Sequence, residues 1–196
     1  SIHMKRAFQD WLRTKYGSKE NLQKSWNRQI DFNDVDIPAK KERFGDTEAT
    51  FRDPAKEMDV IDFYIFYSEI VADTIDYFAA VVKDATQNRK VVGAFYDYMY
   101  EFRGGPEFGH NAGAKIVRSK NIDFICAPPS YYQRQLGSGA ECYRRPFLTG
   151  TLHNKIWFHD NDLATFLFPK VMKKHNVTDA DIKRYMEALA VTPTAQ

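Results

Sequence analysis

The spacing of apolar residues predicts a long helix in the middle of the chain. From Pro54 to about Thr86, large apolar side chains recur at steps of three and four residues, which is the period of one helix face. Asp53 stands before Pro54, a pair typical of a capped helix start with proline in the first turn. One apolar row consists of Val60, Tyr64, Tyr67, Val71, Ile75, Phe78 and Val82, and a second of Phe63, Phe66, Ile70, Tyr77 and Val81. We therefore expect neighbouring elements to cover this helix on more than one side.

Three short apolar runs predict the strands of a parallel sheet. They cover residues 91–96, 122–127 and 155–158, and their continuous apolar character is typical of strands buried on both faces. Helical segments separate the runs, so we expect right-handed crossovers between adjacent parallel strands. The predicted fold class is α/β, with about three parallel strands, flanking helices and a helical C-terminus. Three strands cannot close into a barrel.

Further elements are predicted around these strands. The additional helices are residues 5–16 with Gly17 at the end, a short helix from Ser18, Gly109 to about Arg118, residues 148–152, residues 166–175, and a last helix that Thr178 caps. Residues 31–51 contain Pro38 and Gly45 and are expected to form a long surface connection. Ser1–Met4 resembles a cloning remnant before a native Met start, and we leave it out of the predicted fold.

Composition narrows the class of protein. The length of 196 residues fits one domain, and a content of 43% hydrophobic and 28% charged residues is typical of an ordinary globular protein. Aromatic residues make up 15%, which fits a large core and equally a cleft that stacks sugar rings or bases, so composition does not choose between these. A net charge of +2 is too small to indicate a nucleic-acid partner.

The sequence predicts neither a membrane-spanning segment nor a metal site. No apolar run approaches the roughly 20 residues that a membrane-spanning helix needs, and no signal peptide is recognisable, so we expect a soluble, cytoplasmic protein. The two cysteines, Cys126 and Cys142, lack metal-ligand spacing to each other or to a histidine pair. We therefore expect no metal and no cofactor.

Polar and aromatic side chains follow all three predicted strands. In α/β enzymes the segments after parallel strands carry the chemistry, because the rigid strand positions what the loop exposes. A plain polar turn is the alternative at each position. The candidate cleft residues are Tyr96, Asp97, Tyr98, Tyr131, Arg134, Trp157, Asp160 and Asp162. His110 and His153 are interpreted as hydrogen-bonded structural residues rather than ligands.

Several short motifs occur in a fixed order along the chain. They are Trp11-Leu12-Arg13 with Lys15-Tyr16-Gly17, Val92–Tyr96, Gly109-His110, Ile122–Pro128 with Ser130, Tyr131 and Arg134, and Leu152-His153 with Lys155, Trp157, Asp162 and Thr165. Together they resemble the carboxyl half of the catalytic barrel in beta-galactosidase-like glycoside hydrolases, family 42 and its relatives in clan A. The resemblance implies a partial, half TIM-type barrel over residues 5–168, with residues 169–192 as a helical extension packed on the same domain.

The resemblance also implies a site. Members of the clan are eight-stranded barrels that hydrolyse β-glycosidic bonds with retention, using one Glu after the fourth strand as acid/base and another after the seventh as nucleophile. The three strands here resemble the fifth, sixth and seventh, which puts Asp160 at the nucleophile position. The resemblance places the start of the chain just after the acid/base segment. Asp160 stands where a Glu is expected, and Ala164 where an Arg is expected.

These departures leave three hypotheses. The first is a truncated glycosidase-like half-barrel that is not a competent hydrolase as an isolated chain but retains carbohydrate binding. The second is a retaining, beta-galactosidase-like glycosidase completed by a homo-oligomer or a partner chain, because open sheet edges favour association. The third is a non-catalytic interaction or assembly protein on the same scaffold. None of the three requires nucleic acid or a membrane.

Overall fold

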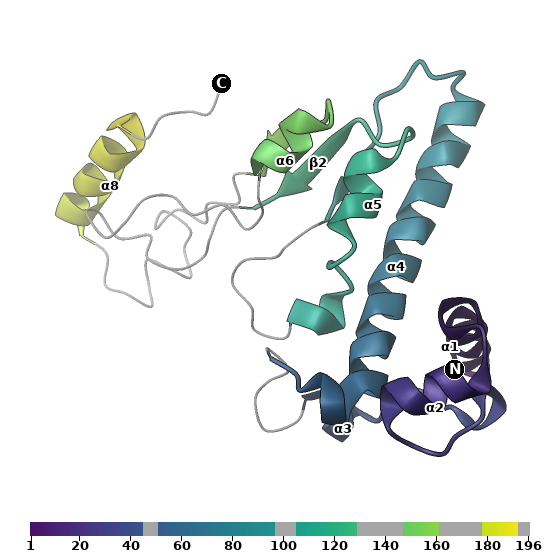
Figure 1. The fold of residues 1–196 in the computed structure, drawn as a ribbon. Helices are drawn as coiled ribbons and strands as arrows, with labels where there is room; N and C mark the ends of the chain where they lie inside the picture. The colour runs from purple at the N-terminus through teal and green to yellow at the C-terminus, as the bar shows by residue number, and fades with distance from the viewer. Residues whose placement is uncertain (45–50, 97–104, 129–146, 161–177, 192–196) are drawn as a thin grey trace. The chain divides into compact units, whose positions relative to one another are not determined.

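A computed structural model describes residues 1–44, 51–96, 105–128, 147–160 and 178–191 (Figure 1). The chain divides into two compact units, of which the first comprises Ser1–Ala127 with Arg144–Phe158. The second comprises Pro128–Tyr143 with His159–Gln196. The predicted domain boundary at residue 168 lies outside the described residues, and so does the predicted helix at residues 166–175.

The first unit begins with two capped helices, as the sequence predicts. Helix α1 (Ile2–Tyr16) ends at Gly17, whose φ of 71° favours glycine. Helix α2 (Lys19–Trp26) follows at once because the Ser18 hydroxyl accepts a hydrogen bond from the Asn21 N–H. Leaving out the first four residues was wrong, since Ser1 caps α1 and Met4 packs against the core.

Residues 31–51 were predicted to be a surface connection, and for the described part this was wrong. The segment contains the 3₁₀ turn η1 (Phe32–Asp34) and helix α3 (Lys40–Phe44). Phe32 and Val35 are buried in the core, because the turn directs both toward α1. The Gln9 side-chain amide of α1 donates to the Val35 carbonyl at 2.8 Å and holds the segment in place.

The long helix α4 (Pro54–Ala85) forms as predicted, with the Asp53 carboxylate accepting from the Ala55 N–H. Helices α1 and α2 lie along its amino half and α5 along its carboxyl half (Figure 1). Two hydrophobic clusters use the helix as a shared wall. The first contains Phe8, Leu12, Leu22, Trp26, Phe32, Val35, Val60, Phe63, Tyr64 and Phe66. The second contains Ala72, Ala79, Tyr96, Ile116, Val117, Ile122 and Ile125.

The expected cover of α4 on more than one side is not seen along its carboxyl half among the described residues. In the carboxyl half, Tyr77 and Phe78 are 64% and 62% exposed, and Val81 and Val82 are also exposed. Helices α1 and α2 cover the corresponding face only in the amino half, where Phe63 and Phe66 are buried. The apolar row therefore continues beyond the elements that bury it. The carboxyl half buries chiefly its small residues, as Ala72 and Ala79 show.

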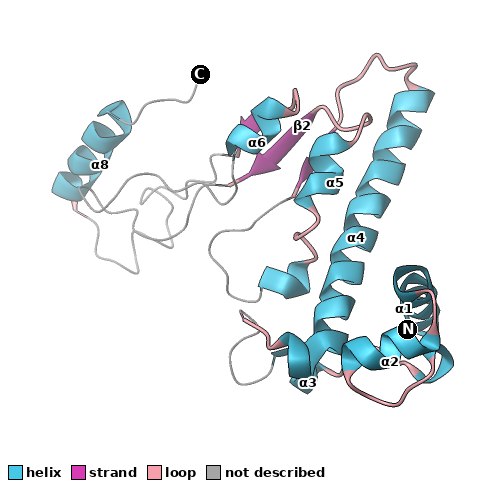
Figure 2. Cartoon of the chain, viewed as in Figure 1, coloured by secondary structure: helices cyan, strands magenta, loops and turns pink. Residues whose placement is uncertain are grey.

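The three predicted strands form one parallel sheet in the order β1-β2-β3. They are β1 (Gly93–Phe95), β2 (Phe124–Ala127) and β3 (Ile156–His159), drawn in magenta in Figure 2. Between them lie the 3₁₀ turn η2 (Gly105–Phe108), α5 (Gly113–Arg118) and α6 (Phe147–Leu152). Helix α5 starts four residues later than predicted, because Gly109 has a φ of 68° that a right-handed helix does not allow.

The second unit contains helix α8 (Asp179–Val191). Its start is the predicted one. The Thr178 hydroxyl accepts from the Asp181 N–H at 3.3 Å, and the Asp181 carboxylate accepts from the Thr178 N–H at 2.9 Å. This reciprocal pair is a capping box with Asp in the position usually taken by Glu.

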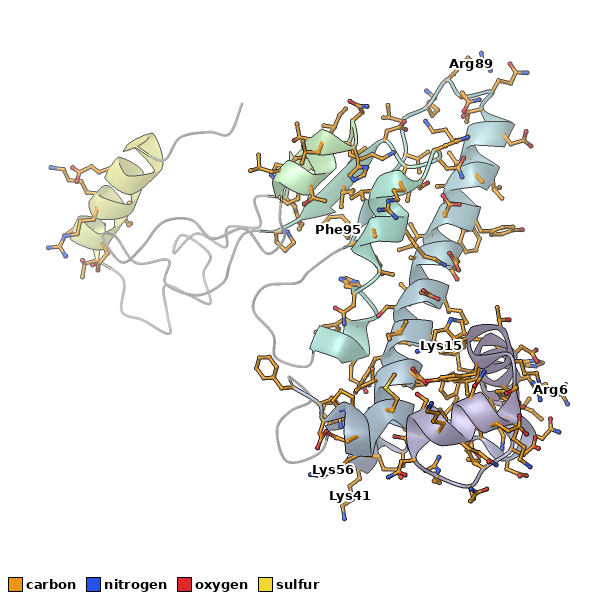
Figure 3. The ribbon with its side chains drawn as sticks, viewed as in Figure 1. Arg6, Lys15, Lys41, Lys56, Arg89 and Phe95 are labelled. Carbon is orange, nitrogen blue, oxygen red and sulfur yellow. The ribbon has the colours of Figure 1, made fainter. Side chains whose placement is uncertain are left out.

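A buried polar cluster ties α1 and α2 to α4. The Asp62 carboxylate is fully buried and accepts hydrogen bonds from Lys15 Nζ at 2.5 Å, Tyr16 Oη at 2.6 Å and Trp26 Nε1 at 2.7 Å. The Lys15 side chain extends between α1 and α4 (Figure 3). One carboxylate thus satisfies donors from two other helices.

We expect Asp62→Asn to lower the free energy of unfolding by roughly 3–5 kcal/mol, because it leaves the partly buried Lys15 ammonium without its counter-charge. Urea denaturation followed by circular dichroism measures the change. The matched control is Asp36→Asn, which breaks the exposed pair with Lys5 and should change stability little. Equal losses in the two variants would contradict a special role for Asp62.

We also expect a stability loss in strong alkali that depends on Tyr16. Burial and the hydrogen bond to Asp62 raise the pKa of Tyr16 from 10.0 to about 12. The unfolded chain therefore loses this proton first, so the contribution is complete below pH 10 and is lost as the pH rises toward 12. Urea titrations should show the stability difference between wild type and Tyr16→Phe shrinking over this interval. A difference independent of pH would exclude the effect.

Candidate functional site

The candidate site lies where the parallel strands end. Tyr96 follows β1 directly, and Asp160 follows β3 and is half-buried. The remaining candidates after the strands, namely Asp97, Tyr98, Tyr131, Arg134 and Asp162, lie outside the described residues. Asp160 belongs to the second unit, whereas Tyr96 and Trp157 belong to the first.

Tyr96 is a core residue in this structure. It is 0% exposed, and its hydroxyl donates to the Gly109 carbonyl at 2.8 Å. The same oxygen accepts from the Ala112 N–H at 3.2 Å, and the Ser68 carbonyl of α4 lies 3.2 Å away. Tyr96 thus joins β1 to α4 and to the segment before α5. It presents no surface on which a sugar could stack.

The two faces of the sheet differ in cover. Helices α4 and α5 pack on the face that carries Ile125. On the opposite face, the Phe124 ring lies over Gly93 and its centroid is 5.8 Å from that of Phe158. Phe95 and Phe158 are 54% and 56% exposed there, and Figure 3 labels Phe95. The second face is therefore aromatic and largely uncovered among the described residues.

Trp157 lies on a different face from Phe158. Side chains alternate along a strand, so Trp157 points away from the face on which Phe124 and Phe158 meet, and it is half-buried. Asp160 belongs to the other unit, so the predicted presence of Trp157 and Asp160 in one cleft stays a prediction.

Polar groups at the amino ends of the strands fix the position of β3. The Asp123 carboxylate accepts from Lys83 Nζ at 2.5 Å and from the Val92 N–H at 2.7 Å, and the Asp123 carbonyl accepts from the Ile156 N–H at 2.9 Å. Burial alone would raise the pKa of Asp123, but the bonds from Lys83 and Val92 outweigh it and hold the pKa below its usual range. The carboxylate therefore stays charged and joins the start of β1 to α4, while the backbone carbonyl of the same residue bonds the start of β3.

Lys155 completes this arrangement. Its ammonium donates to the Ser119 carbonyl at 2.5 Å and to the Ile122 carbonyl at 2.6 Å, just before β3 begins. Sequence reasoning missed Asp123 and Lys155 as positioning residues. Asp123 carries a usable signal, since it is a lone charge within the apolar run 122–127. Lys155 carries none, because a lysine at the edge of a strand is ordinary.

The two histidines differ in their surroundings. Burial lowers the pKa of His110, and its ring centroid lies 4.8 Å from that of Tyr96. His153 is exposed in the turn after α6. In the described part of the chain, His, Cys, Asp and Glu side chains form no group that could hold a metal ion. No helix in that part is both long and apolar enough to cross a bilayer.

The parallel sheet, with α4 and α5 on one face and a carboxylate after β3, defines part of an α/β barrel of the TIM type. A family model described as Beta-galactosidase, that of glycoside hydrolase family 42, matches residues 1–119. The match covers more than half of the 196 residues, and the chain belongs to this family. No significant match links the chain to a curated protein or to a solved structure.

The family match confirms the resemblance found in the sequence and also limits it. The matched residues include α1 to α5 and β1, and they end before β2. Asp160, Trp157 and the other candidates after β2 and β3 therefore lie beyond the match. The correspondence of the strands to the fifth, sixth and seventh of a barrel stays a prediction.

We expect Tyr96→Phe to lower the free energy of unfolding by about 1–3 kcal/mol, because it removes the buried partner of the Ala112 N–H. Thermal and urea denaturation measure the loss. Tyr77→Phe, on the exposed half of α4, is the matched control and should be neutral. If Tyr96→Phe were neutral in stability and instead weakened sugar binding, the core role would be wrong.

Proposed function

We propose that the chain is the carboxyl-side part of a beta-galactosidase-like catalytic barrel, that it binds β-galactosides, and that its 196 residues alone do not hydrolyse them. Membership of glycoside hydrolase family 42 supports the substrate class. The observation that carries the proposal is a carboxylate, Asp160, directly after the third parallel strand. In the proposed frame Asp160 occupies the nucleophile position.

The chemistry of retention explains why hydrolysis is not expected from this chain alone. A retaining glycosidase needs two carboxyl groups about 5–5.5 Å apart, one to attack the anomeric carbon and one to protonate the leaving oxygen. The resemblance assigns only the first role to a residue here. Asp160 is one methylene shorter than Glu, which withdraws the carboxylate by roughly an ångström and can cost on the order of 10²-fold in rate.

The surroundings of Asp160 weaken catalysis further. Ala164 stands where the family pattern has an Arg, so a fixed cation that would orient the neighbouring carboxylates is missing at that position. Hydroxyl and aromatic contacts to a sugar do not need this precision. Sugar binding can therefore persist where turnover does not.

A second candidate function has its own support. The uncovered aromatic sheet face, with Phe95, Ile156 and Phe158 between 54% and 62% exposed, is the kind of surface that proteins bury against a partner. Strands β1 and β3 also lie at the two edges of the sheet. An active beta-galactosidase in which a second copy or another polypeptide completes the barrel would use these surfaces, and Asp160 would then be its nucleophile.

The test combines sugar binding, turnover and mass. We expect galactose to shift backbone amide signals in NMR spectra of the chain, and we expect no cleavage of a nitrophenyl β-galactoside above the buffer rate. Asp160→Asn should weaken the binding by about tenfold, equal to about 1.4 kcal/mol, by removing a charged acceptor for sugar hydroxyls. Asp10→Asn, which alters an exposed carboxylate of α1, is the control and should leave the binding unchanged.

The outcomes separate the hypotheses. Cleavage that Asp160→Asn abolishes, in a sample that light scattering shows to be oligomeric, would establish the completed barrel instead. Cleavage by a monomer would refute the requirement for a second carboxyl from elsewhere. A complete absence of sugar-induced shifts would leave only the role as an assembly protein.

A further inference from the structure

The carboxyl half of α4 presents a continuous exposed row of uncharged side chains, called here the α4 row. Its members recur at steps of three and four residues, so they lie on one face of the helix over about three turns. Every member is exposed, although most are large and apolar. The α4 row consists of Thr74, Tyr77, Phe78, Val81, Val82 and Ala85.

The charged residues of this half of α4 lie on other faces of the helix. Asp73 and Asp76 bond side chains of α5 and of the segment that follows it, and Lys83 bonds the Asp123 carboxylate. Asp84 lies at the edge of the α4 row and is exposed. A helix face that stays in water normally carries charged or polar side chains. The α4 row is therefore suited to burial.

The α4 row continues a face that is already an interface in the amino half of the helix. Phe63 and Phe66 on that face are buried against α1 and α2, and Ile70 still packs against the same cluster. Helices α1 and α2 accompany only the amino half of α4 (Figure 1). One further helix of about three turns would extend this interface over the α4 row.

The ends of the α4 row favour an antiparallel second copy as that helix. In a parallel pair, α1 and α2 of both copies would flank the contact at the same end, and the cations Arg89 and Lys90 of both copies would meet at the other end. Figure 3 labels Arg89 beyond the carboxyl end of α4. In an antiparallel pair, the two copies of α1 and α2 lie at opposite ends, outside the overlap, and the like charges are kept apart.

One antiparallel register matches large side chains with smaller ones. When Phe78 of one copy lies opposite Val81 of the other, Thr74 lies opposite Ala85 in the next layer. Each layer occurs twice, because a twofold axis relates the copies. Such layers are how antiparallel helices interdigitate.

The same register brings polar groups of opposite character together. The Tyr77 hydroxyl comes close to the level of Asp84 of the second copy, where the carboxylate can accept its proton in a hydrogen bond. Arg89 and Lys90 come level with Glu69 of the second copy. The edges and ends of the contact are thus complementary in charge, while its centre is uncharged.

We propose that the α4 row is the interface of an antiparallel homodimer, in which it packs against the same row of a second copy of the chain. The proposal is independent of the proposed function, because it uses a helix face and neither the strand ends nor the aromatic sheet face. It therefore stands or falls separately from the glycosidase assignment.

The exposed area sets the expected strength of the dimer. Tyr77 and Phe78 are 64% and 62% exposed, and Val81 and Val82 are 49% and 40% exposed. With roughly 150–250 Å² for a fully exposed aromatic side chain, these residues present about 350–400 Å² per copy. The smaller residues and the edges of the row bring the total for two copies toward about 1,000 Å², the lower limit of specific interfaces. A weak dimer with a dissociation constant on the order of 10–100 µM follows.

Sedimentation equilibrium of the full chain, from about 5 to 300 µM, tests the association across this range. We expect the mass to rise from that of a monomer toward that of a dimer. Val81→Lys places a charge in both halves of the apolar contact and should raise the dissociation constant about a hundredfold. Ile65→Lys is the matched control, since it places the same charge on another exposed apolar residue of α4 outside the row, and it should leave the association unchanged.

Engineered cysteines test the orientation. Thr74→Cys and Ala85→Cys, each combined with Cys142→Ser, should form a mixed disulfide when the two variants are oxidised together, because the register brings these positions within disulfide reach. Neither variant should link to itself, since the two copies of position 74 are about 16 Å apart along the helix. Cys126 is 2% exposed and can stay in place.

Three results would overturn the proposal. The first is a monomer at the highest concentration. The second is a dimer that persists in folded Val81→Lys, which would assign the association to another surface such as the aromatic sheet face. The third is efficient linkage of Thr74→Cys to itself. If circular dichroism shows that Val81→Lys does not fold, the mixed disulfide decides, and its absence counts against the dimer.

Discussion

Burial of the amino half of α4 is the interaction on which the rest of the structure depends. Val60, Phe63 and Phe66 lie against α1 and α2, and burial of each such side chain stabilises the fold by about 1.5–3 kcal/mol. Exposed ion pairs such as Lys5–Asp36 contribute at most about 1 kcal/mol each. Apolar packing therefore sets the stability. The buried Asp62 carboxylate restricts how α1 and α2 pack against α4, because its three hydrogen-bond donors come from these two helices.

The sheet packs against the same helix, and the amino and carboxyl ends of its strands differ chemically. At the amino ends, Asp123 and Lys155 join the strands to one another, and the bond from Lys83 joins them to α4. The Lys83–Asp123 ion pair and the bonds from the Lys155 ammonium to two backbone carbonyls are short and partly buried, so the register of the strands is held at their amino ends. Asp160 follows β3 at the carboxyl end. In α/β enzymes the segments after parallel strands carry the chemistry, because the rigid strands position what the loops expose.

Local signals made much of the fold predictable from the sequence. Gly17, Ser18, Asp53 and Thr178 mark helix ends by hydrogen bonds and backbone angles that involve only a few neighbouring residues. Tertiary facts were less predictable. An aromatic side chain such as Tyr96 is of the kind that stacks on sugars. Only its burial, and the hydrogen bonds of its hydroxyl with Gly109 and Ala112, show that it is a core residue. The apolar rows of α4 likewise indicate which residues would be stabilised by burial, but not whether another helix or strand packs against them.

Of the candidate site, the sequence could supply the order of residues but not their faces. Trp157 and Phe158 are adjacent on β3 and therefore lie on opposite faces of the sheet. Phe158 and Phe95 are exposed on the face that the described residues leave largely uncovered. What covers a face depends on tertiary packing, which the alternation of side chains along a strand does not specify.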